Sequence, residues 1–501
     1  MSVKTAPTGA GPDASPAEAG PAERKRALPW LSVLDRPLTS YHLIIGCAGL
    51  LLAIGLAMVL STSSASQLDS GGSPYSVFVK QLLGALIGLP MVWLLSRIPA
   101  RVLRAVAYPT LLAAIGGLVL VLAFGTTVYG AERWIEIGGI QVQPSEFAKL
   151  ALLLWGADLL ARKERLGQLS DWRALLIPLL PGSAVVVLLV MLGDDLGTTF
   201  LLLVILLALL WVIGTPGRLL ACMIGLIVFA LAMLLVIEPW RAARLTGYLN
   251  PSGGPVGSNM QSIQGKWAIG SGGWFGVGLG DSKQKWGWVP NASNDFIFAI
   301  LGEELGLIGT VCVVVLYGGL AYGGLRVARR MADPFMRLAA AGITVWIVVQ
   351  ALVNISAVVG LLPITGVPLP LISQGLSSLL VTMAGIGILL GFARREPGAA
   401  EALAALGPRL PARIIRSIMP APAAAAAASA SASAGPRAAR RRAGPARAGA
   451  ARPAPARPGP AGPGPAGPAR PGSAPVRPGP AQGRPRPAGG ASAAAQFRRP
   501  V

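Results

Sequence analysis

The sequence is poor in the residues on which most hydrolytic and zinc chemistry depends. It has one histidine, His42, and three cysteines, Cys47, Cys222 and Cys312, among 501 residues. The cysteines lie far apart inside apolar runs, so they offer neither a disulfide framework nor a CxxC metal site. A lone histidine leaves a His-based triad or a His-ligated zinc without a second residue.

Charged residues are also scarce. They make up 13% of the chain against 53% hydrophobic residues, and the mean hydropathy is +0.61. This composition is too apolar for a water-soluble protein of this length, so it predicts an all-α polytopic membrane protein. The net charge of +22 belongs mainly to the tail, where 18 arginines face only Glu396 and Glu401 from Arg394 onward. No aromatic residues are interleaved with those arginines, so we expect no nucleic-acid partner.

Ten apolar runs approach the roughly 20 residues that a membrane-spanning helix needs. They predict one membrane domain over 41–396, between a disordered cytoplasmic lead (1–40) and a disordered Ala/Pro/Gly/Arg-rich tail (397–501). The first run is long for a cleaved signal peptide and indicates an uncleaved anchor. The run from 295 is too long to lie straight, so we expect its first turns to be tilted or re-entrant. The ten runs are 42–60, 76–96, 102–124, 145–161, 174–192, 197–213, 217–237, 295–323, 338–360 and 372–393.

The short loops indicate the orientation. Basic residues follow spans two, four, six and eight, whereas the loops after spans one, three, five and nine contain only Arg133. The positive-inside rule therefore predicts that both termini are cytoplasmic and that the large loop 238–294, between spans seven and eight, is extracellular. The five basic residues of that loop then need a separate reason. They are Arg241, Arg244, Lys266, Lys283 and Lys285.

Several charged residues lie close to the predicted spans. Glu146 and Lys149 are three positions apart, so they can pair on one helix face, either as a functional pair or as side chains that snorkel to the interface. Asp195 follows Asp194 in a short connection and suits either the N-cap of span six or a functional site.

Asp295 lies where a polar loop meets the eighth span. An ionisable group at membrane depth costs roughly 2.5 to 3.5 kcal/mol and by default marks a functional site. The alternative is a helix N-cap. A helix N-terminus lowers the pKa of an acid, whereas a general base needs a raised pKa. Glu303 and Glu304 are neighbouring acids that could raise it.

Two other segments have unusual composition. GVGLGD in the loop before Asp295 lacks a preceding strand and a Walker lysine, so it indicates backbone flexibility and not a dinucleotide site. Prolines and glycines between spans nine and ten predict a rigid, irregular hairpin. The loop tryptophans suit interfacial anchoring or, alternatively, stacking on sugar rings. They are Trp267, Trp274, Trp286 and Trp288.

Four separated motifs over about 40–395 carry a family resemblance. RWIEIGGIQVQPSEFAKL, DLGT, NDFIFAILGEELGLIG and NISAVVGLLPITGVPLPLIS stand in order. The chain resembles the SEDS family (shape, elongation, division and sporulation). GEELG and the basic tail favour its division members, as found in actinobacteria, over its elongation members.

The resemblance implies a ten-span fold and a peptidoglycan glycosyltransferase that polymerises lipid II at the outer face of the cell membrane. It also implies a class B penicillin-binding transpeptidase and other division proteins as partners, and a place at the division septum. Asp295 falls at the essential aspartate of the family, and Arg133, Glu146 and Lys149 match conserved positions around its central cavity. We add Gln261 and Lys266 as candidate substrate contacts.

Three segments depart from the family pattern, and none removes Asp295. Other residues replace a His or Thr before the aspartate, an Asn-Pro-Trp in the large loop, and a SYGGSS ending. The replacements are Ser293–Asn294, Pro251–Ser252 and Ser373–Gln374–Gly375–Leu376–Ser377.

The expected chemistry follows from the compartment. Outside the cell there is no ATP or sugar nucleotide, so the donor must carry its own leaving group, and a lipid pyrophosphate meets that need. Asp295 would take the proton of the acceptor GlcNAc hydroxyl while Arg133 and Lys149 stabilise the departing pyrophosphate, with inversion at the anomeric carbon. This chemistry needs no cofactor and no metal site, although a divalent cation is compatible with it.

Two other functions stay open. A lipid II flippase would use Glu146, Lys149, Glu303 and Glu304 as charged sites near the midplane. A non-catalytic division scaffold would depend mainly on the tail. There Arg440–Arg442 would attract anionic lipid or an acidic cytoplasmic protein, unless the tail is only a solvated linker.

Overall fold

The computed structural model describes residues 38–402, except 70–71, 129–130, 139, 169–170, 238–259 and 400. All of them belong to one compact unit, residues 1–417. Our expectations for the N-terminal lead, the basic tail, Arg241, Arg244 and Pro251–Ser252 therefore lie outside the described residues.

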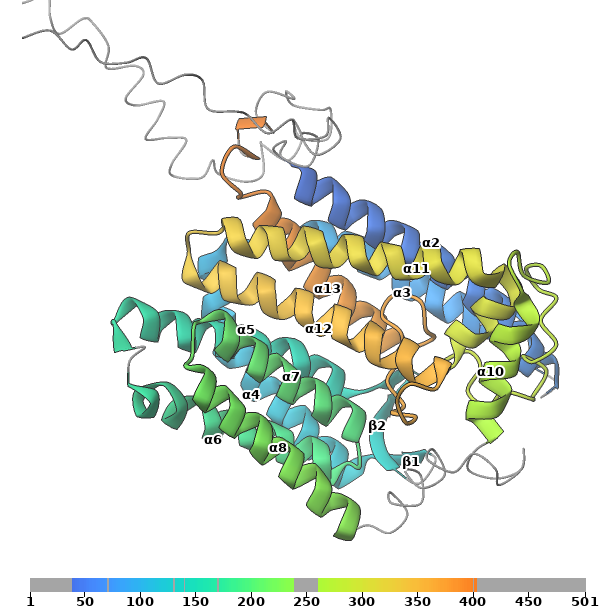
Figure 1. The fold of residues 1–501 in the computed structure, drawn as a ribbon, viewed down its shortest axis with the longest axis horizontal. Helices are drawn as coiled ribbons and strands as arrows, with labels where there is room; N and C mark the ends of the chain where they lie inside the picture. The colour runs from blue at the N-terminus through green and yellow to red at the C-terminus, as the bar shows by residue number, and fades with distance from the viewer. Residues whose placement is uncertain are drawn as a thin grey trace, which may run out of the picture. The chain divides into compact units, whose positions relative to one another are not determined.

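Each of the ten predicted spans corresponds to a helix (Figure 1). Seven of them are long and apolar enough to cross a membrane, α7 and the apolar part of α8 are shorter, and α5 carries charged residues among its apolar ones. The prediction of a multi-pass helical membrane protein is confirmed. The helices are α2 (Thr39–Asp69), α3 (Ser76–Leu95), α4 (Ala100–Phe124), α5 (Pro144–Arg165), α6 (Trp172–Leu192), α7 (Leu196–Val212), α8 (Gly217–Ile237), α11 (Ile297–Arg330), α12 (Pro334–Val359) and α13 (Leu376–Ala393).

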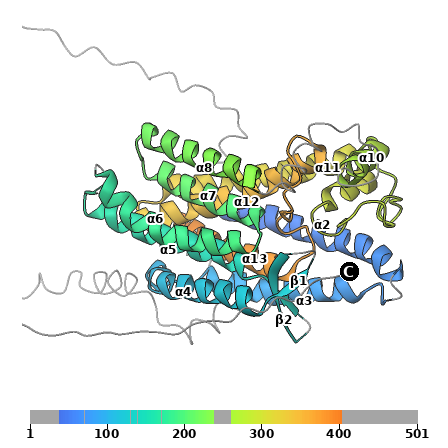
Figure 2. The same ribbon diagram turned by 90° about the horizontal axis from the view of Figure 1, so that it is seen from below.

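Helix α12 lies at the centre of the bundle and shows how the sequence sets the ends of a helix. Asp333 caps its start by accepting bonds from the N–H groups of Phe335 and Met336, and Pro334 occupies the first turn. Gly360 ends it in the left-handed conformation, with φ of 82°. The helix packs against α5, α7, α11, α13 and a further helix, α10 (Met260–Gly272) (Figures 1 and 2), and Trp346 is fully buried in this core.

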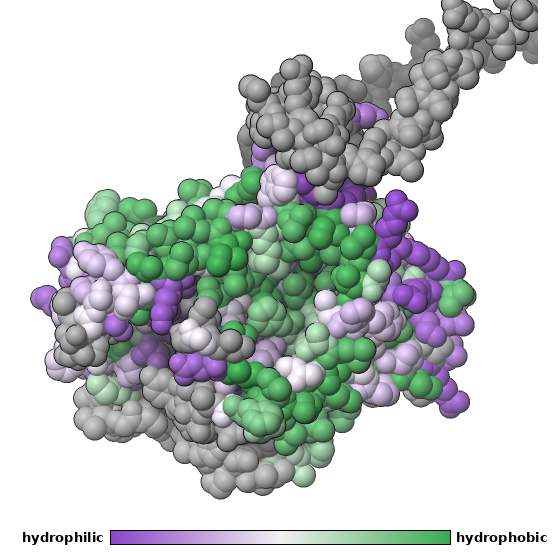
Figure 3. Space-filling view, turned by 180° about the vertical axis from the view of Figure 1, so that it is seen from behind, coloured by the Kyte–Doolittle hydropathy of each residue, from purple (hydrophilic) through white to green (hydrophobic). Residues whose placement is uncertain are grey.

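Large apolar side chains also cover the outside of the bundle. Figure 3 shows a broad hydrophobic surface, with hydrophilic residues gathered toward its sides. On α3, Leu83, Leu86, Ile87 and Leu89 are each more than half exposed. An exposed apolar surface of this extent suits contact with lipid and not with water.

The chain departs from a purely helical fold between α4 and α5. Three short strands, β1 (Thr126–Val128), β2 (Ala131–Ile137) and β3 (Ile140–Val142), form an antiparallel sheet in the order β1-β2-β3. Ile135 pairs with Val142, and Gly138 turns the chain with φ of 59°. The strands form in a loop between two predicted spans because the segment RWIEIGGIQV is rich in β-branched and aromatic residues flanking a glycine turn, and the membrane bundle itself is all-α as predicted.

The second departure lies in the predicted loop 238–294, which contains a helix, α10 (Met260–Gly272). The residues after α10 support a break in α11 at Gly306, where φ is 67° and ψ is −163°. Leu307 N and Ile308 N donate to the carbonyls of Gly273 and Trp274, at 2.9 and 3.2 Å. In return, Val277 N and Gly278 N donate to the carbonyls of Glu303 and Glu304, at 2.9 and 3.2 Å.

Segment 273–278 thus replaces the hydrogen bonds that the helix loses at its break, as a buried interruption requires. The expectation that the eighth span does not run straight is confirmed. Its first part, 297–304, is wholly buried and follows directly after Asp295.

Candidate active site

Asp295 does not occupy the N-cap of α11. The N-cap position is Phe296, which has no side-chain cap, so the capping interpretation is wrong. Oδ2 of Asp295 lies 3.7 Å from the point where a Cβ on Gly366 would stand, and Gly366 has φ of 69°. The carboxylate of Asp295 therefore faces the segment that joins α12 to α13, residues 361–375, which we call the proline loop.

The proline loop fixes the backbone around Asp295. The Asn354 amide on α12 donates to the carbonyls of Asp295 and Val367, at 2.8 and 2.7 Å. Ser373 Oγ donates to the carbonyl of Asn294 at 2.6 Å, and Gln374 N donates to that of Ser293 at 2.9 Å. The loop contains neither helix nor strand, so the prediction of an irregular hairpin is confirmed.

Two of the departures from the SEDS pattern meet in these contacts. Ser293 and Asn294 accept bonds from Gln374 and Ser373 through their backbone carbonyls. A backbone acceptor is available whatever side chain the residue carries. The Ser293 and Asn294 replacements therefore leave the acceptors of this support in place.

Glu146 and Lys149 form the predicted pair inside the bundle. Their charged atoms are 2.9 Å apart, and their side chains are 2% and 0% exposed, so the snorkelling interpretation is wrong. Lys149 Nζ also donates to Gln350 Oε1 at 3.0 Å and lies 5.3 Å from the centre of the Trp346 ring. A buried ion pair needs such additional partners to offset the loss of hydration.

Gln350 connects this pair to the proline loop. Its Nε2 donates to the carbonyl of Pro368 at 2.9 Å, while its Oε1 also accepts from the Trp346 indole at 2.8 Å. Gln350 and Asn354 are one helical turn apart on α12, hence on one face. Lys149 and Asp295 are therefore linked through neighbouring residues of α12 and the same loop.

Asp195 caps α7 and also bonds to the segment that begins α5. One carboxylate oxygen caps α7 by accepting from Thr198 N at 3.1 Å, so the capping prediction is confirmed. The other oxygen accepts from Gln143 Nε2 and Ser145 Oγ, both at 2.9 Å. At the start of α7, a Cβ on Gly197 would lie 2.7 Å from the Thr365 carbonyl, so this end of α7 also packs on the proline loop.

Arg133 lies on β2 beside this cluster. Its guanidinium donates to the carbonyls of Gly193, at 3.3 Å, and of Asp194. It lines a small cavity together with Ser145 and Asp195. The proline loop packs on the start of α7 in this cluster and faces Asp295 at Gly366, so it joins the two groups of candidate residues.

Gln261 and Lys266 reach the Asp295 region from α10. Gln261 Nε2 donates to the carbonyl of Pro290 at 3.0 Å, in the loop that leads to Asp295. The exposed Lys266 side chain lies against Gly360, 2.5 Å from the point where a Cβ on that glycine would stand. Gly265 packs on the ring of Phe296, so α10 lies directly beside the start of α11.

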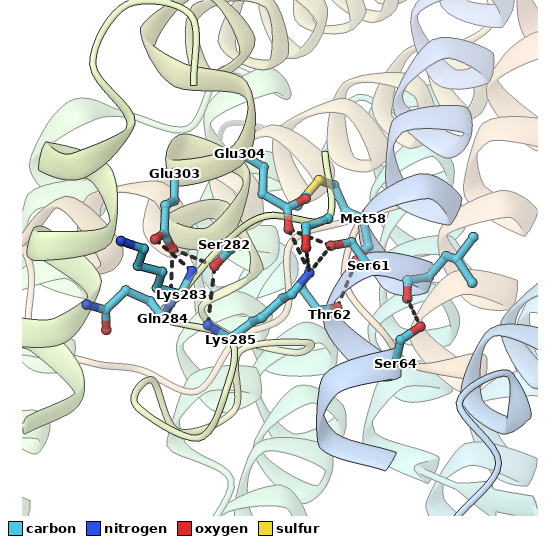
Figure 4. A network of polar contacts seen from close by, with 12 residues as sticks. Met58, Ser61, Thr62, Ser64, Ser282, Lys283, Gln284, Lys285, Glu303 and Glu304 are labelled. Atoms are coloured by element: carbon cyan, nitrogen blue, oxygen red, sulfur yellow. Dashed lines mark hydrogen bonds and ion pairs between the residues drawn. The ribbon is translucent and has the colours of Figure 1, made fainter. Parts of the chain in front are cut away.

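Glu303 and Glu304 have other partners than Asp295 (Figure 4). Glu303 accepts from Ser282 Oγ and from the N–H groups of Lys283 and Gln284, at 2.5, 3.0 and 3.3 Å. Glu304 accepts from Ser61 on α2 and from Lys285 Nζ, at 2.5 and 3.3 Å.

Lys285 also donates to Ser61 Oγ at 3.0 Å and to the Gly280 carbonyl at 2.5 Å. Lys285, one of the five unexplained basic residues of the large loop, is therefore a buried partner of Glu304. Sequence reasoning missed this network because Ser61 and Glu304 lie 243 positions apart. In the part of the chain that the structure describes, no group of three His, Cys, Asp or Glu side chains is placed to hold a metal ion.

Comparison with protein-family models gives a match that includes all of the candidate site residues. A model of the FtsW/RodA/SpoVE proteins, described as cell cycle proteins, matches residues 41–397. The chain belongs to the FtsW/RodA/SpoVE family.

Relatives within the family come from several bacteria. The FtsW proteins of Mycobacterium bovis and Mycobacterium tuberculosis, each named "Probable peptidoglycan glycosyltransferase FtsW", are 43% identical over 393 residues, covering 78% of this chain and 74% of theirs. The protein of the same name from Thioalkalivibrio sulfidiphilus is 40% identical over 350 residues, covering 68% of this chain and 86% of its own.

Solved structures of the family share the fold. The Thermus thermophilus rod shape determining protein RodA is 29% identical, with a TM-score of 0.52 over 70% of this chain and 96% of its own. A chain solved in work on the structural coordination of polymerization and crosslinking by a peptidoglycan synthase complex is also 29% identical. Its TM-score is 0.59, over 70% of this chain and 97% of its own.

Proposed function

We propose that this FtsW/RodA/SpoVE protein is a peptidoglycan glycosyltransferase that polymerises lipid II into glycan strands during septal cell-wall synthesis. The name of the FtsW relatives supports the reaction class. The observation that carries the proposal in this chain is the placement of Asp295. Its carboxylate faces Gly366, on a backbone held by Asn354 and the proline loop, and Phe296 takes the N-cap position of α11.

Asp295 acts as the general base in this proposal. It accepts the proton of the acceptor GlcNAc hydroxyl as that oxygen forms a bond to the anomeric carbon of the donor. The bond from that carbon to the lipid diphosphate breaks, and the diphosphate leaves with the bonding electrons, so the configuration inverts. General-base catalysis contributes roughly 10² to 10⁴ to the rate of such a step.

The exposure of the three candidate cationic side chains decides which of them we assign to the diphosphate. Lys266 is exposed beside the Asp295 region and Arg133 is half-buried on the other side of the proline loop, so we assign these two to the diphosphate. Lys149 is fully buried and already bonded to Glu146 and Gln350. In place of the expected contact with the diphosphate, we therefore assign Lys149 a positioning role, in which it holds Gln350, the side chain that donates to the Pro368 carbonyl of the proline loop.

The deciding experiment uses the purified full chain with lipid II in detergent, with a class B penicillin-binding transpeptidase added. The wild type should form glycan strands, and Asp295→Asn should lower their rate at least about 100-fold. Asp281→Asn is the matched control, because Asp281 is an exposed acid of the same loop. No bilayer exists in detergent, so the absence of strands with any partner present would instead favour a lipid II flippase.

We also propose the transpeptidase as a stable partner, by analogy with the peptidoglycan synthase complex. Co-purification of the two membrane proteins and faster strand synthesis in the complex would support it.

We further propose that the protein lies at the division septum and that both of its termini are cytoplasmic. A phosphatase fused after residue 402 should be inactive and one inserted at 70–71 active, since alkaline phosphatase works only outside the cytoplasm.

A further inference from the structure

Three arginines gather at the end of the bundle where α3 and α13 both stop. Arg97 follows α3, and Arg394 and Arg395 follow α13. The two helix ends pack closely, because a Cβ on Gly391 would lie 3.1 Å from the Ser96 carbonyl. Arg395 joins them by donating to the carbonyls of Gly391 and Ile98, both at 2.8 Å.

Arg97 and Arg394 are left with unbalanced positive charge. Among the described residues, neither forms an ion pair, and Arg97 Nε is buried without a hydrogen-bond partner. Burial, followed by the positive charge of Arg394, lowers the pKa of Arg97 and likewise that of Arg395. The acid next in sequence, Glu396, is buried and faces Arg330 at 3.8 Å.

The surface beside these guanidiniums is apolar. The Arg97 guanidinium lies 4.4 Å from the ring centre of Trp93, which is 45% exposed. Toward the middle of α3, Leu86 and Leu89 are more than half exposed. A tryptophan between exposed leucines and an arginine is typical of the level at which lipid headgroups meet acyl chains. The unbalanced charge therefore stands where a phosphate of the bilayer would lie.

We propose that Arg97 and Arg394 bind the phosphate of an anionic phospholipid whose acyl chain lies along Trp93 and the exposed face of α3. Guanidinium groups suit this ligand because their N–H donors match phosphate oxygens in pairs. The site is separate from Asp295, since the 18 residues of α13 place about 27 Å between its two ends.

The test uses the full chain in nanodiscs of equal parts phosphatidylglycerol and phosphatidylcholine, followed by native mass spectrometry of the lipids that stay bound. The wild type should retain phosphatidylglycerol in preference. Arg97→Gln with Arg394→Gln should lower that preference roughly 30-fold, the effect expected of two charges at the membrane surface. The matched control is Arg101→Gln with Arg218→Gln, which removes the same charge from two exposed positions at other helix starts and should keep the preference.

Three results would overturn the proposal. The first is a wild type without preference, and the second is a preference that persists undiminished in Arg97→Gln with Arg394→Gln, which would then belong to the tail. The third is displacement of phosphatidylglycerol by inorganic phosphate from the wild type alone, which would make the ligand a free anion. If the double glutamine variant does not fold, Arg97→Lys with Arg394→Lys keeps the charge but removes the paired donors. It should then retain less phosphatidylglycerol than the wild type, and equal retention would count against the site.

Discussion

The side-chain amide of Asn354 bridges the backbone carbonyls of Asp295 and Val367, at 2.8 and 2.7 Å. This one buried side chain joins the segment that carries the candidate base to the loop that its carboxylate faces. Both segments are irregular, so neither has a hydrogen-bond ladder of its own to set its position. The reactive geometry therefore depends on α12, although no residue of α12 is proposed to touch substrate.

Asn354→Ala should impair strand synthesis more than folding. The substitution removes both bonds and leaves two carbonyls without this donor, at about 1 to 3 kcal/mol for each buried group. We expect strand synthesis to fall at least about tenfold while the protein still purifies as a single species. Ser183→Ala is the control, because Ser183 is a buried hydroxyl that bonds only to its own helix, at Leu180. Equal activity of the two variants would show that the bridge does not position Asp295.

Thermal unfolding in detergent should show how much the Glu146–Lys149 ion pair contributes to stability. Lys149→Met leaves the buried Glu146 carboxylate without its cation, which costs about 3 to 5 kcal/mol. Lys149→Met combined with Glu146→Leu removes both charges and should unfold at a higher temperature than the single variant. If the double variant unfolds at the lower temperature, the pair is not the source of the loss.

Gly306→Ala should disrupt the break in α11. The new Cβ would stand 2.4 Å from Gly276 N, and the backbone φ of 67° disfavours any side chain. We expect a lower unfolding temperature and faster protease cleavage in segment 273–278. Gly318→Ala is the matched control, because Gly318 lies on the same helix with nothing within 4 Å of an added Cβ. There alanine should stabilise the helix by up to about 1 kcal/mol.

Asp333 should make stability depend on acidic pH. Burial alone would raise the pKa of Asp333. The hydrogen bond and charge of Arg104, with the N–H groups of Met336 and Phe335, outweigh burial and lower it. A lowered folded pKa adds stability above the unfolded value of about 3.9, and this stability is lost as pH falls through the folded pKa.

The unfolding temperature of the wild type should therefore drop as the pH falls below about 4. Asp333→Asn should unfold at a lower temperature at neutral pH and show a smaller acid drop, and Arg104→Gln should behave similarly. A variant that keeps the full acid drop of the wild type would assign the dependence to other carboxylates.

The features that the sequence predicted correctly are those set by residues close together in the chain. Long apolar runs placed the ten helices that correspond to the predicted spans, and an i, i+3 spacing placed the Glu146–Lys149 pair. The cap at Asp195 was also readable, because it forms within one turn. Each of these features depends on residues that are close together in the chain.

The features that the sequence did not predict depend on contacts between residues far apart in the chain. Asp295 has the local signature of a cap, yet contacts from α12 and the proline loop set its position, and the N-cap of α11 falls at Phe296. The network of Ser61, Lys285 and Glu304 joins α2 to a loop more than 200 positions away. Composition and residue spacing give no indication of contacts between residues that are so far apart in the sequence.

Segment 273–278 and the broken helix α11 hydrogen-bond to each other through their backbones, and this pairing limits insertions and deletions in the segment. Four backbone groups of α11 find partners at two pairs of positions in this segment, 273–274 and 277–278, so the pairing depends on the number of residues between the two pairs. A single deletion there would shift one pair relative to the other and leave buried backbone groups without partners. Homologous chains that keep this break should tolerate exchanged side chains in the segment, but not a changed length.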